Sequence, residues 1–124
     1  ERDFPEAVLR LIAYGLNNRA RETYERNSSG WQQSRHSLQR LDPVPQIAVW
    51  KSLVAADYRA VMPEITVPVL LAFGAQSNFY TAATAQFLLD RIPNAQLSLY
   101  EGADHCPMLL QPERYISELM AFLR

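Results

Sequence analysis

An unbroken apolar run, residues 69–73, sets the strongest constraint on how this chain can fold. Pro68 precedes the run and Gly74 ends it, which leaves too little room for a buried helix. A short continuous run between such breaks is typical of a parallel strand that is buried on both faces. A strand of this kind needs a neighbouring strand on each side and helices over both faces. We therefore expect an α/β fold.

The segments after this run alternate between helix and strand patterns. We expect a helix from Thr81 to about Arg91, a strand from Gln96 to Tyr100, and a last helix that Gln111 caps. The order strand, helix, strand, helix predicts two parallel strands joined by a right-handed crossover. One neighbour is not enough for the first strand, so we expect its other neighbours to come from a segment or chain outside these residues.

The first sixty residues carry helix patterns and no convincing strand. The pattern predicts helices from Phe4 to Leu16, over 31–41 and over 46–60, a polar continuation over 20–26, a turn at 27–30 and a rigid break at the prolines of 42–45. The chain is thus expected to divide into a helical segment, 1–60, and an α/β segment, 61–124.

Composition excludes several classes of protein. With 124 residues, 48% hydrophobic and 20% charged, the chain fits one globular domain, and a net charge of −1 argues against binding to nucleic acid or an anionic membrane. Cys106 is the single cysteine, so no internal disulfide forms and a reducing compartment, the cytoplasm, is expected. No apolar run approaches the ~20 residues of a membrane helix. His36, His105 and Cys106 lack metal-ligand spacing and the glycines do not cluster, so we expect no metal and no cofactor.

The candidate functional residue is His105, in the loop that follows the second expected strand. A strand that ends in a short loop can hold an imidazole at the edge of a sheet, and imidazole exchanges protons near neutral pH. From the local residues alone, a turn histidine bonded to its own backbone is an equal alternative. Cys106, its neighbour, is expected to be a packing residue, because adjacent side chains seldom meet in the geometry of a catalytic pair.

Four segments in order resemble the C-terminal half of an α/β-hydrolase: 65–74 (ITVPVLLAFG), 92–95 (IPNA), 102–105 (GADH) and 111–113 (QPE). The resemblance covers about 57–124, and the helical segment before it takes the position of the cap domain of that family. It implies a mostly parallel sheet, a nucleophile elbow before the cap, and His105 as the general base that activates the nucleophile.

The chain departs from the family pattern at two places. None of its serines lies in a Gly-x-Ser-x-Gly elbow, so the resemblance implies a nucleophile in an N-terminal half that these residues do not contain. The family usually carries an aspartate three residues after the glycine that ends the first strand, and Ser77 stands there, followed by Asn78. Neither side chain can carry the charge that stabilises an imidazolium, although either can orient it. We reject Asp104 as the orienting group because it adjoins His105.

Two functions follow from this pattern. The first is a hydrolase that cleaves esters, lactones or amides, or transfers acyl groups, with a small-molecule acyl substrate. Its nucleophile would come from the N-terminal half of the same precursor or of another chain, so this chain alone is expected to be inactive. The second is a degenerate hydrolase fold that binds a ligand or a partner without catalysis. The start at Glu1, without an initiator methionine or a signal-peptide pattern, leads us to expect part of a longer protein.

Overall fold

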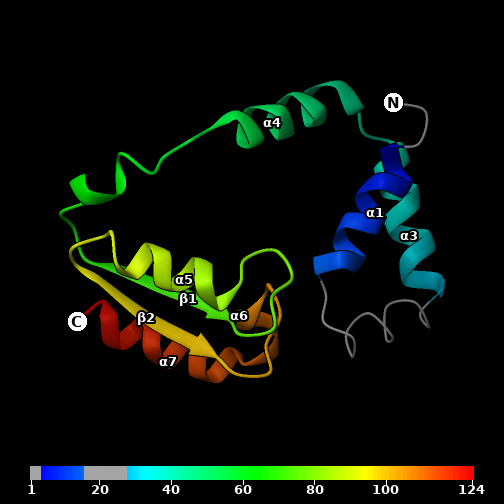
Figure 1. Cartoon of the computed structure of the whole chain (residues 1–124). Coiled ribbons are helices and arrows are strands. Elements are labelled where there is room, and N and C mark those ends of the chain that lie inside the picture. The colour runs from blue at the N-terminus through cyan, green and yellow to red at the C-terminus, as the bar shows by residue number, and fades with distance from the viewer. Residues whose placement is uncertain (1–3, 16–27) are drawn as a thin grey trace. The chain divides into compact units, whose positions relative to one another are not determined.

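The computed structural model describes residues 4–15 and 28–124, which fall into two compact units, Glu1–Asp57 and Tyr58–Arg124. The first unit contains the helices α1 (Phe4–Gly15), α3 (Ser28–Gln39) and α4 (Pro43–Ala55). The second contains the 3-10 turn η1 (Met62–Glu64), β1 (Val69–Gly74), α5 (Ala82–Leu89), β2 (Ala95–Tyr100), α6 (Pro107–Leu110) and α7 (Pro112–Phe122) (Figure 1). The parallel sheet with flanking helices confirms the predicted α/β class.

The sheet of the second unit consists of β1 and β2, which run parallel with Val69 opposite Ala95 and Gly74 opposite Tyr100. Side chains alternate between the faces of a strand, so Leu71 and Leu97 share one face while Ser98 and Tyr100 occupy the other. Figure 1 shows α5 and α7 on opposite sides of the sheet, and most residues of the two strands are half-buried between them. The strands therefore lie between two helix layers, as the continuous apolar run predicts.

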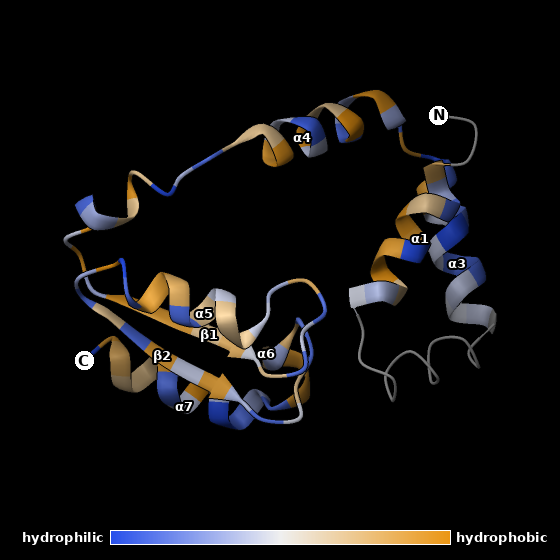
Figure 2. Cartoon of the chain, viewed as in Figure 1, coloured by the Kyte–Doolittle hydropathy of each residue, from blue (hydrophilic) through white to orange (hydrophobic). Residues whose placement is uncertain are grey.

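Large apolar surfaces of the second unit stay open to solvent. Within the described residues β1 pairs with β2 alone, which leaves its other edge without a strand. Ile116 and Met120 of α7 and Leu123, the residue directly after this helix, are all more than half exposed, although the sequence places them on one apolar face. Figure 2 shows in orange the hydrophobic residues that make up most of β1. Exposed apolar surfaces of this size usually mark a site where a partner binds.

Two predictions in the first unit are wrong. The prolines expected to form a break, 42–45, instead begin α4, because Asp42 occupies the N-cap and its Oδ1 accepts a hydrogen bond of 3.0 Å from the Val44 amide. Proline suits the first turn of a helix, where an amide hydrogen has no intrahelical partner. Of the turn expected at 27–30, the described residues 28–30 form instead the first turn of α3, which begins at Ser28. The polar continuation predicted for 20–26 lies outside the described residues.

The helices α1 and α3 pack together in the first unit. Leu9 of α1 is fully buried, and Glu6 bonds to Arg10 one turn further along the same helix at 3.3 Å. Glu6 also pairs with Arg35 of α3 at 3.4 Å. Exposed ion pairs of this type contribute little stability, so the burial of Leu9 dominates this contact. No helix in the described part of the chain is long and apolar enough to cross a membrane.

Candidate active site

The carboxyl ends of β1 and β2 bring two loops together at one edge of the sheet. Two backbone bonds tie the turn after β1 to the end of β2 and to the loop that follows it, 101–106. The Ala75 amide donates to the Tyr100 carbonyl at 3.0 Å, and the Gln76 amide donates to the Ala103 carbonyl at 2.8 Å. Ligand sites of open α/β sheets lie outside this edge of the strands. The parallel pairing thus positions residues 77 and 105, which are far apart in sequence, at the same site.

Gly74 permits the close approach of these two loops. A Cβ atom at this position would lie 1.7 Å from the Asp104 carbonyl oxygen and 2.7 Å from that of Ala103, both of which are backbone atoms. Backbone atoms cannot rotate away as a flexible side chain can. Any larger residue at position 74 would therefore push the histidine loop off the end of β1.

Two residues of the loop itself, Gly102 and Asp104, stabilise the backbone around His105. Gly102 has a φ of 75°, a left-handed conformation that glycine adopts at low cost. Asp104 is only 2% exposed, and its Oδ1 accepts a hydrogen bond of 2.9 Å from the Cys106 amide. The Asp104 carboxylate thus stabilises the turn of the backbone around residue 105, a structural role that the sequence pattern did not predict.

The His105 side chain is exposed and lies against two aromatic rings. Its ring centroid is 4.9 Å from that of Phe79, with the planes 78° apart, and 5.5 Å from that of Tyr80. Such contacts restrict the rotation of the imidazole without using its nitrogens. In the part of the chain that the structure describes, neither ring nitrogen of His105 makes a hydrogen bond or an ion pair. An accessible imidazole with both nitrogens available can exchange a proton with a group brought to it.

A cavity of about 80 Å³ adjoins His105, and Ala72, Phe73, Gly74, Ser77, Tyr80 and His105 line it. Ligand pockets usually measure ~300–1,000 Å³, so this cavity has room for water or a small polar group and not for a whole substrate. Ser77 is 7% exposed and contributes to the wall, whereas Asn78 is exposed and does not. Of the two residues at the expected position of the acid, Ser77 is thus the one that shares a cavity with His105.

The backbone around Ser77 directs two hydrogen-bond donors at its side chain. The Ser77 Oγ accepts from the amide of Phe79 at 3.3 Å and from the amide of Tyr80 at 3.1 Å. Both lone pairs of the hydroxyl are therefore used, and its proton remains to be donated. The same two amides would stabilise a carboxylate at this position, because hydrogen bonds to the charged form lower the pKa of an acid.

Other reactive groups in the described residues are poorly suited to catalysis. Burial raises the pKa of the Cys106 thiol, and the nearby Asp104 carboxylate raises it further, so this cysteine is not an activated thiolate. His36 is exposed on α3 in the other unit. No group of three or more His, Cys, Asp or Glu side chains is arranged to hold a metal ion within residues 4–15 and 28–124.

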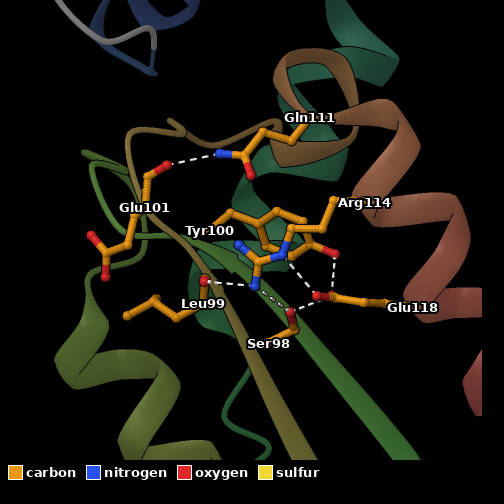
Figure 3. Close-up of polar contacts among 7 residues, drawn as sticks. All are labelled: Ser98, Leu99, Tyr100, Glu101, Gln111, Arg114 and Glu118. Carbon is orange, nitrogen blue, oxygen red and sulfur yellow. Dashed lines mark hydrogen bonds and ion pairs between the residues drawn. The ribbon is translucent and has the colours of Figure 1, made fainter.

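A polar cluster of Ser98, Tyr100, Arg114 and Glu118 joins β2 to α7 (Figure 3). The hydroxyls of Ser98 and Tyr100 both donate to Oε2 of Glu118, the latter at 2.6 Å. Arg114 donates to the second oxygen, Oε1, at 2.8 Å. The hydrogen bonds from Ser98 and Tyr100, with that from Arg114 and its charge, lower the pKa of Glu118 from 4.5 to about 2. The carboxylate is therefore charged at neutral pH.

The sequence pattern missed these contacts. Gln111 is the N-cap residue of α7, as the sequence predicted, but its side chain makes no capping bond. Its Nε2 donates instead to the Glu101 carbonyl in the histidine loop at 2.7 Å. Two features of the sequence could have indicated these contacts. Two adjacent aromatic residues, Phe79 and Tyr80, follow the first strand closely, and Ser98 and Tyr100 alternate with leucines along the second strand, which places both hydroxyls on one face.

An apolar groove of about 490 Å³ lies in the first unit, between α1 and α4. Its volume falls within the range of ligand pockets. Among the described residues, Lys51 is the single charged one in its wall, and the others that line it are Phe4, Ala7, Val8, Leu11, Ile47, Trp50, Val54 and Ala55.

Similar proteins support the relationship that the fold indicates. No family model matches the chain. A pimeloyl-acyl-carrier-protein methyl ester esterase from Aromatoleum aromaticum is 31% identical over 77 residues, which cover 62% of this chain and 31% of the esterase. The polyketide synthase ThaQ from Burkholderia thailandensis is 34% identical over 83 residues, which cover 67% of this chain and 4% of the synthase.

The similarity in structure extends over almost the whole chain. A hydrolase from Oleispira antarctica superposes with a TM-score of 0.68 and 23% identity over 98% of this chain and 47% of that protein. Together with the strand order and the esterase relatives, this places the chain in the α/β-hydrolase fold family. The chain spans about a third of the length of the esterase and about half of the hydrolase.

Proposed function

We propose that His105 is the general base of an α/β-hydrolase whose nucleophile lies in an N-terminal half of the same fold, in the same precursor or in another chain. The observation that carries this proposal is the position of His105, exposed beside a small cavity at the carboxyl edge of the parallel sheet, with its ring nitrogens unbonded within the described residues. The open edge of β1 and the exposed apolar side chains of α7 support the missing half as partner.

The chemistry is acyl transfer through a hydroxyl nucleophile. His105 takes the proton of that hydroxyl as its oxygen attacks the acyl carbon, and later returns the proton to the leaving oxygen or nitrogen as that bond breaks. In this scheme Ser77 occupies the position of the acid, whose oxygen must accept a hydrogen bond from the imidazole N–H. The Ser77 Oγ already accepts two backbone hydrogen bonds, so it orients the ring only weakly. A neutral hydroxyl stabilises an imidazolium less than a carboxylate does, so we expect slow turnover unless an acid comes from the missing half.

The substrate we propose is a carboxylic ester, lactone or amide of an aliphatic acyl group. The esterase relatives are named for a methyl ester of an acyl chain, which supports this class for the present chain. The apolar groove between α1 and α4 has the volume and lining that such a chain requires.

Exchange of His105 for alanine in the complete protein tests the proposal, with turnover of a short p-nitrophenyl ester as the assay. We expect kcat to fall by about 10²- to 10⁴-fold, the usual contribution of a general base. His36→Ala is the matched control, because it removes the other histidine of this chain from an exposed position in the first unit. Undiminished turnover in His105→Ala would refute the role of His105.

A second candidate function is a hydrolase fold without catalysis that binds a ligand or a partner. Ser77 at the position of the acid favours it, because the chain supplies no carboxylate to the cavity beside His105 within the described residues. A fluorophosphonate probe labels an activated serine covalently. Labelling of an elbow serine in the complete protein supports the hydrolase, and complete absence of labelling supports the binding protein.

A further inference from the structure

The loop that carries His105 begins directly after Tyr100, the last residue of β2, and the side chain of Tyr100 is fully buried. Its hydroxyl bonds to Glu118 at 2.6 Å, while its carbonyl oxygen accepts from the Ala75 amide at 3.0 Å. The side chain of this residue is therefore held by α7, and its backbone by the turn after β1. The starting point of the histidine loop is fixed by these two contacts together.

Arg114 of α7 reaches the same strand end through three further contacts. Its Nη2 donates to the Leu99 carbonyl at 3.1 Å and to the Ser98 Oγ at 3.3 Å, and its Cζ lies 4.3 Å from the centre of the Tyr100 ring. A planar guanidinium can make such contacts simultaneously because its donors have a fixed geometry. Figure 3 shows Arg114 between the strand and the Glu118 carboxylate, which it also binds.

A second contact from the start of α7 reaches into the loop itself. The Gln111 Nε2 donates to the Glu101 carbonyl at 2.7 Å, one residue beyond the strand (Figure 3). The histidine loop thus leaves a strand end that is bonded to Arg114 and Glu118 of α7, and its first residue is bonded to Gln111, the N-cap of that helix. A shift of α7 along the sheet would move the loop with it.

We propose that Tyr100, Arg114 and Glu118 are positioning residues that set the location of His105 for proton transfer. The proposal rests on the proposed function, since it assumes that His105 is the general base. None of the three residues lines the cavity beside His105, so they act on the reaction through the loop. Misplacement of a catalytic group by about 1 Å can lower the rate by about 10²-fold. Loss of one contact among Tyr100, Arg114 and Glu118 should therefore change kcat measurably.

Tyr100→Phe in the complete protein is the sharpest test, because it removes one hydroxyl and keeps the ring against Arg114. We expect kcat for a p-nitrophenyl ester to fall by about 10- to 100-fold with KM unchanged, since substrate binding does not involve this residue. Tyr115→Phe is the matched control: its ring lies 6.3 Å from that of Tyr100, and its hydroxyl makes no hydrogen bond within the described residues. We expect that variant to keep the kcat of the unmodified protein.

A spectroscopic measurement separates the failure of this proposal from failure of the proposed function. The ring signals of ¹³C-labelled His105, assigned by their loss in His105→Ala, report its surroundings whether or not the protein turns over an ester. We expect them to shift or broaden in Tyr100→Phe and to stay in place in Tyr115→Phe. Equal kcat values and equal His105 signals in the two variants would overturn the proposal.

Three further variants keep the test decisive if Tyr100→Phe does not fold. Gln111→Ala removes only the bond to the Glu101 carbonyl, and we expect it to shift the His105 signals and lower kcat less than Tyr100→Phe would. Arg114→Lys keeps the positive charge and loses the several fixed donors of the guanidinium, so it should retain more of kcat than Arg114→Ala. Unchanged His105 signals in Gln111→Ala and Arg114→Ala would contradict the positioning role.

Discussion

Replacement of Gly74 by alanine should separate the histidine loop from the end of β1. The added Cβ would lie 1.7 Å from the Asp104 carbonyl oxygen and 2.6 Å from its carbon, so the two backbone segments must move apart. Movement breaks the bonds of the Ala75 and Gln76 amides to the loop, worth about 1 kcal/mol each, and adds overpacking strain of about 1–3 kcal/mol. We expect a loss of about 3–5 kcal/mol in the free energy of unfolding.

Gly102→Ala is the matched control in the same loop. Its added Cβ would meet nothing within 4 Å, so the cost comes only from the left-handed φ of 75° and should be about 1–2 kcal/mol. Comparison of the two variants therefore separates the free-energy cost of a steric clash at Gly74 from that of a left-handed backbone at Gly102.

Urea unfolding of the complete protein, followed by hydrogen exchange of peptides over 69–77 and 95–106, measures both variants. Tryptophan fluorescence does not report on this unit, because Trp31 and Trp50 both lie in the other one. The reasoning is wrong if Gly102→Ala is the more destabilising change, or if Gly74→Ala lies within about 1 kcal/mol of the unmodified protein.

Three other predictions follow from the same structure. Ser77→Asp should raise kcat/KM for a p-nitrophenyl ester by about 10²- to 10⁴-fold, because two amides already point at that side chain, and equal turnover in the uncharged control Ser77→Asn would contradict this. The lowered pKa of Glu118 stabilises the fold above pH 4.5, and this stability is lost as the pH falls towards 2. The shift corresponds to at most about 3 kcal/mol of stability, and because the side chain is 32% exposed, screening by solvent reduces this to about 1–2 kcal/mol. Acid titration of stability in Glu118→Gln should lack this component, and a curve identical to that of the unmodified protein would disprove it. The isolated chain should self-associate through the open edge of β1, and a monodisperse, cooperatively unfolding monomer in size-exclusion chromatography and thermal melts would show otherwise.

Local sequence signals were sufficient for the strands and for the histidine loop. The strand expected over residues 69–73 extends one residue further, to Gly74, and the second strand begins at Ala95 instead of Gln96. Short apolar runs bounded by proline and glycine are strong signals because both the burial and the breaks are encoded locally. The position of His105 after the second strand followed from the same pattern.

Turn chemistry was predicted less well than the strands. The prolines of 42–45 were read as a break, although Asp42 before them has the side chain of an N-cap. A proline can end one element or begin the next, and the residue before it decides between the two. The short helix α6, which holds Pro107 buried directly after the histidine loop, gave no separate signal.

The sequence by itself determined that two parallel strands carry a histidine loop at their common edge, because burial and chain breaks are local properties. Only the tertiary structure decided which groups meet there. The approach of Gly74 to the Asp104 carbonyl, the cavity shared by Ser77 and His105, and the anchor from Glu118 to Tyr100 all join residues distant in sequence. Such contacts depend on strand register and helix placement, which no single stretch of sequence encodes.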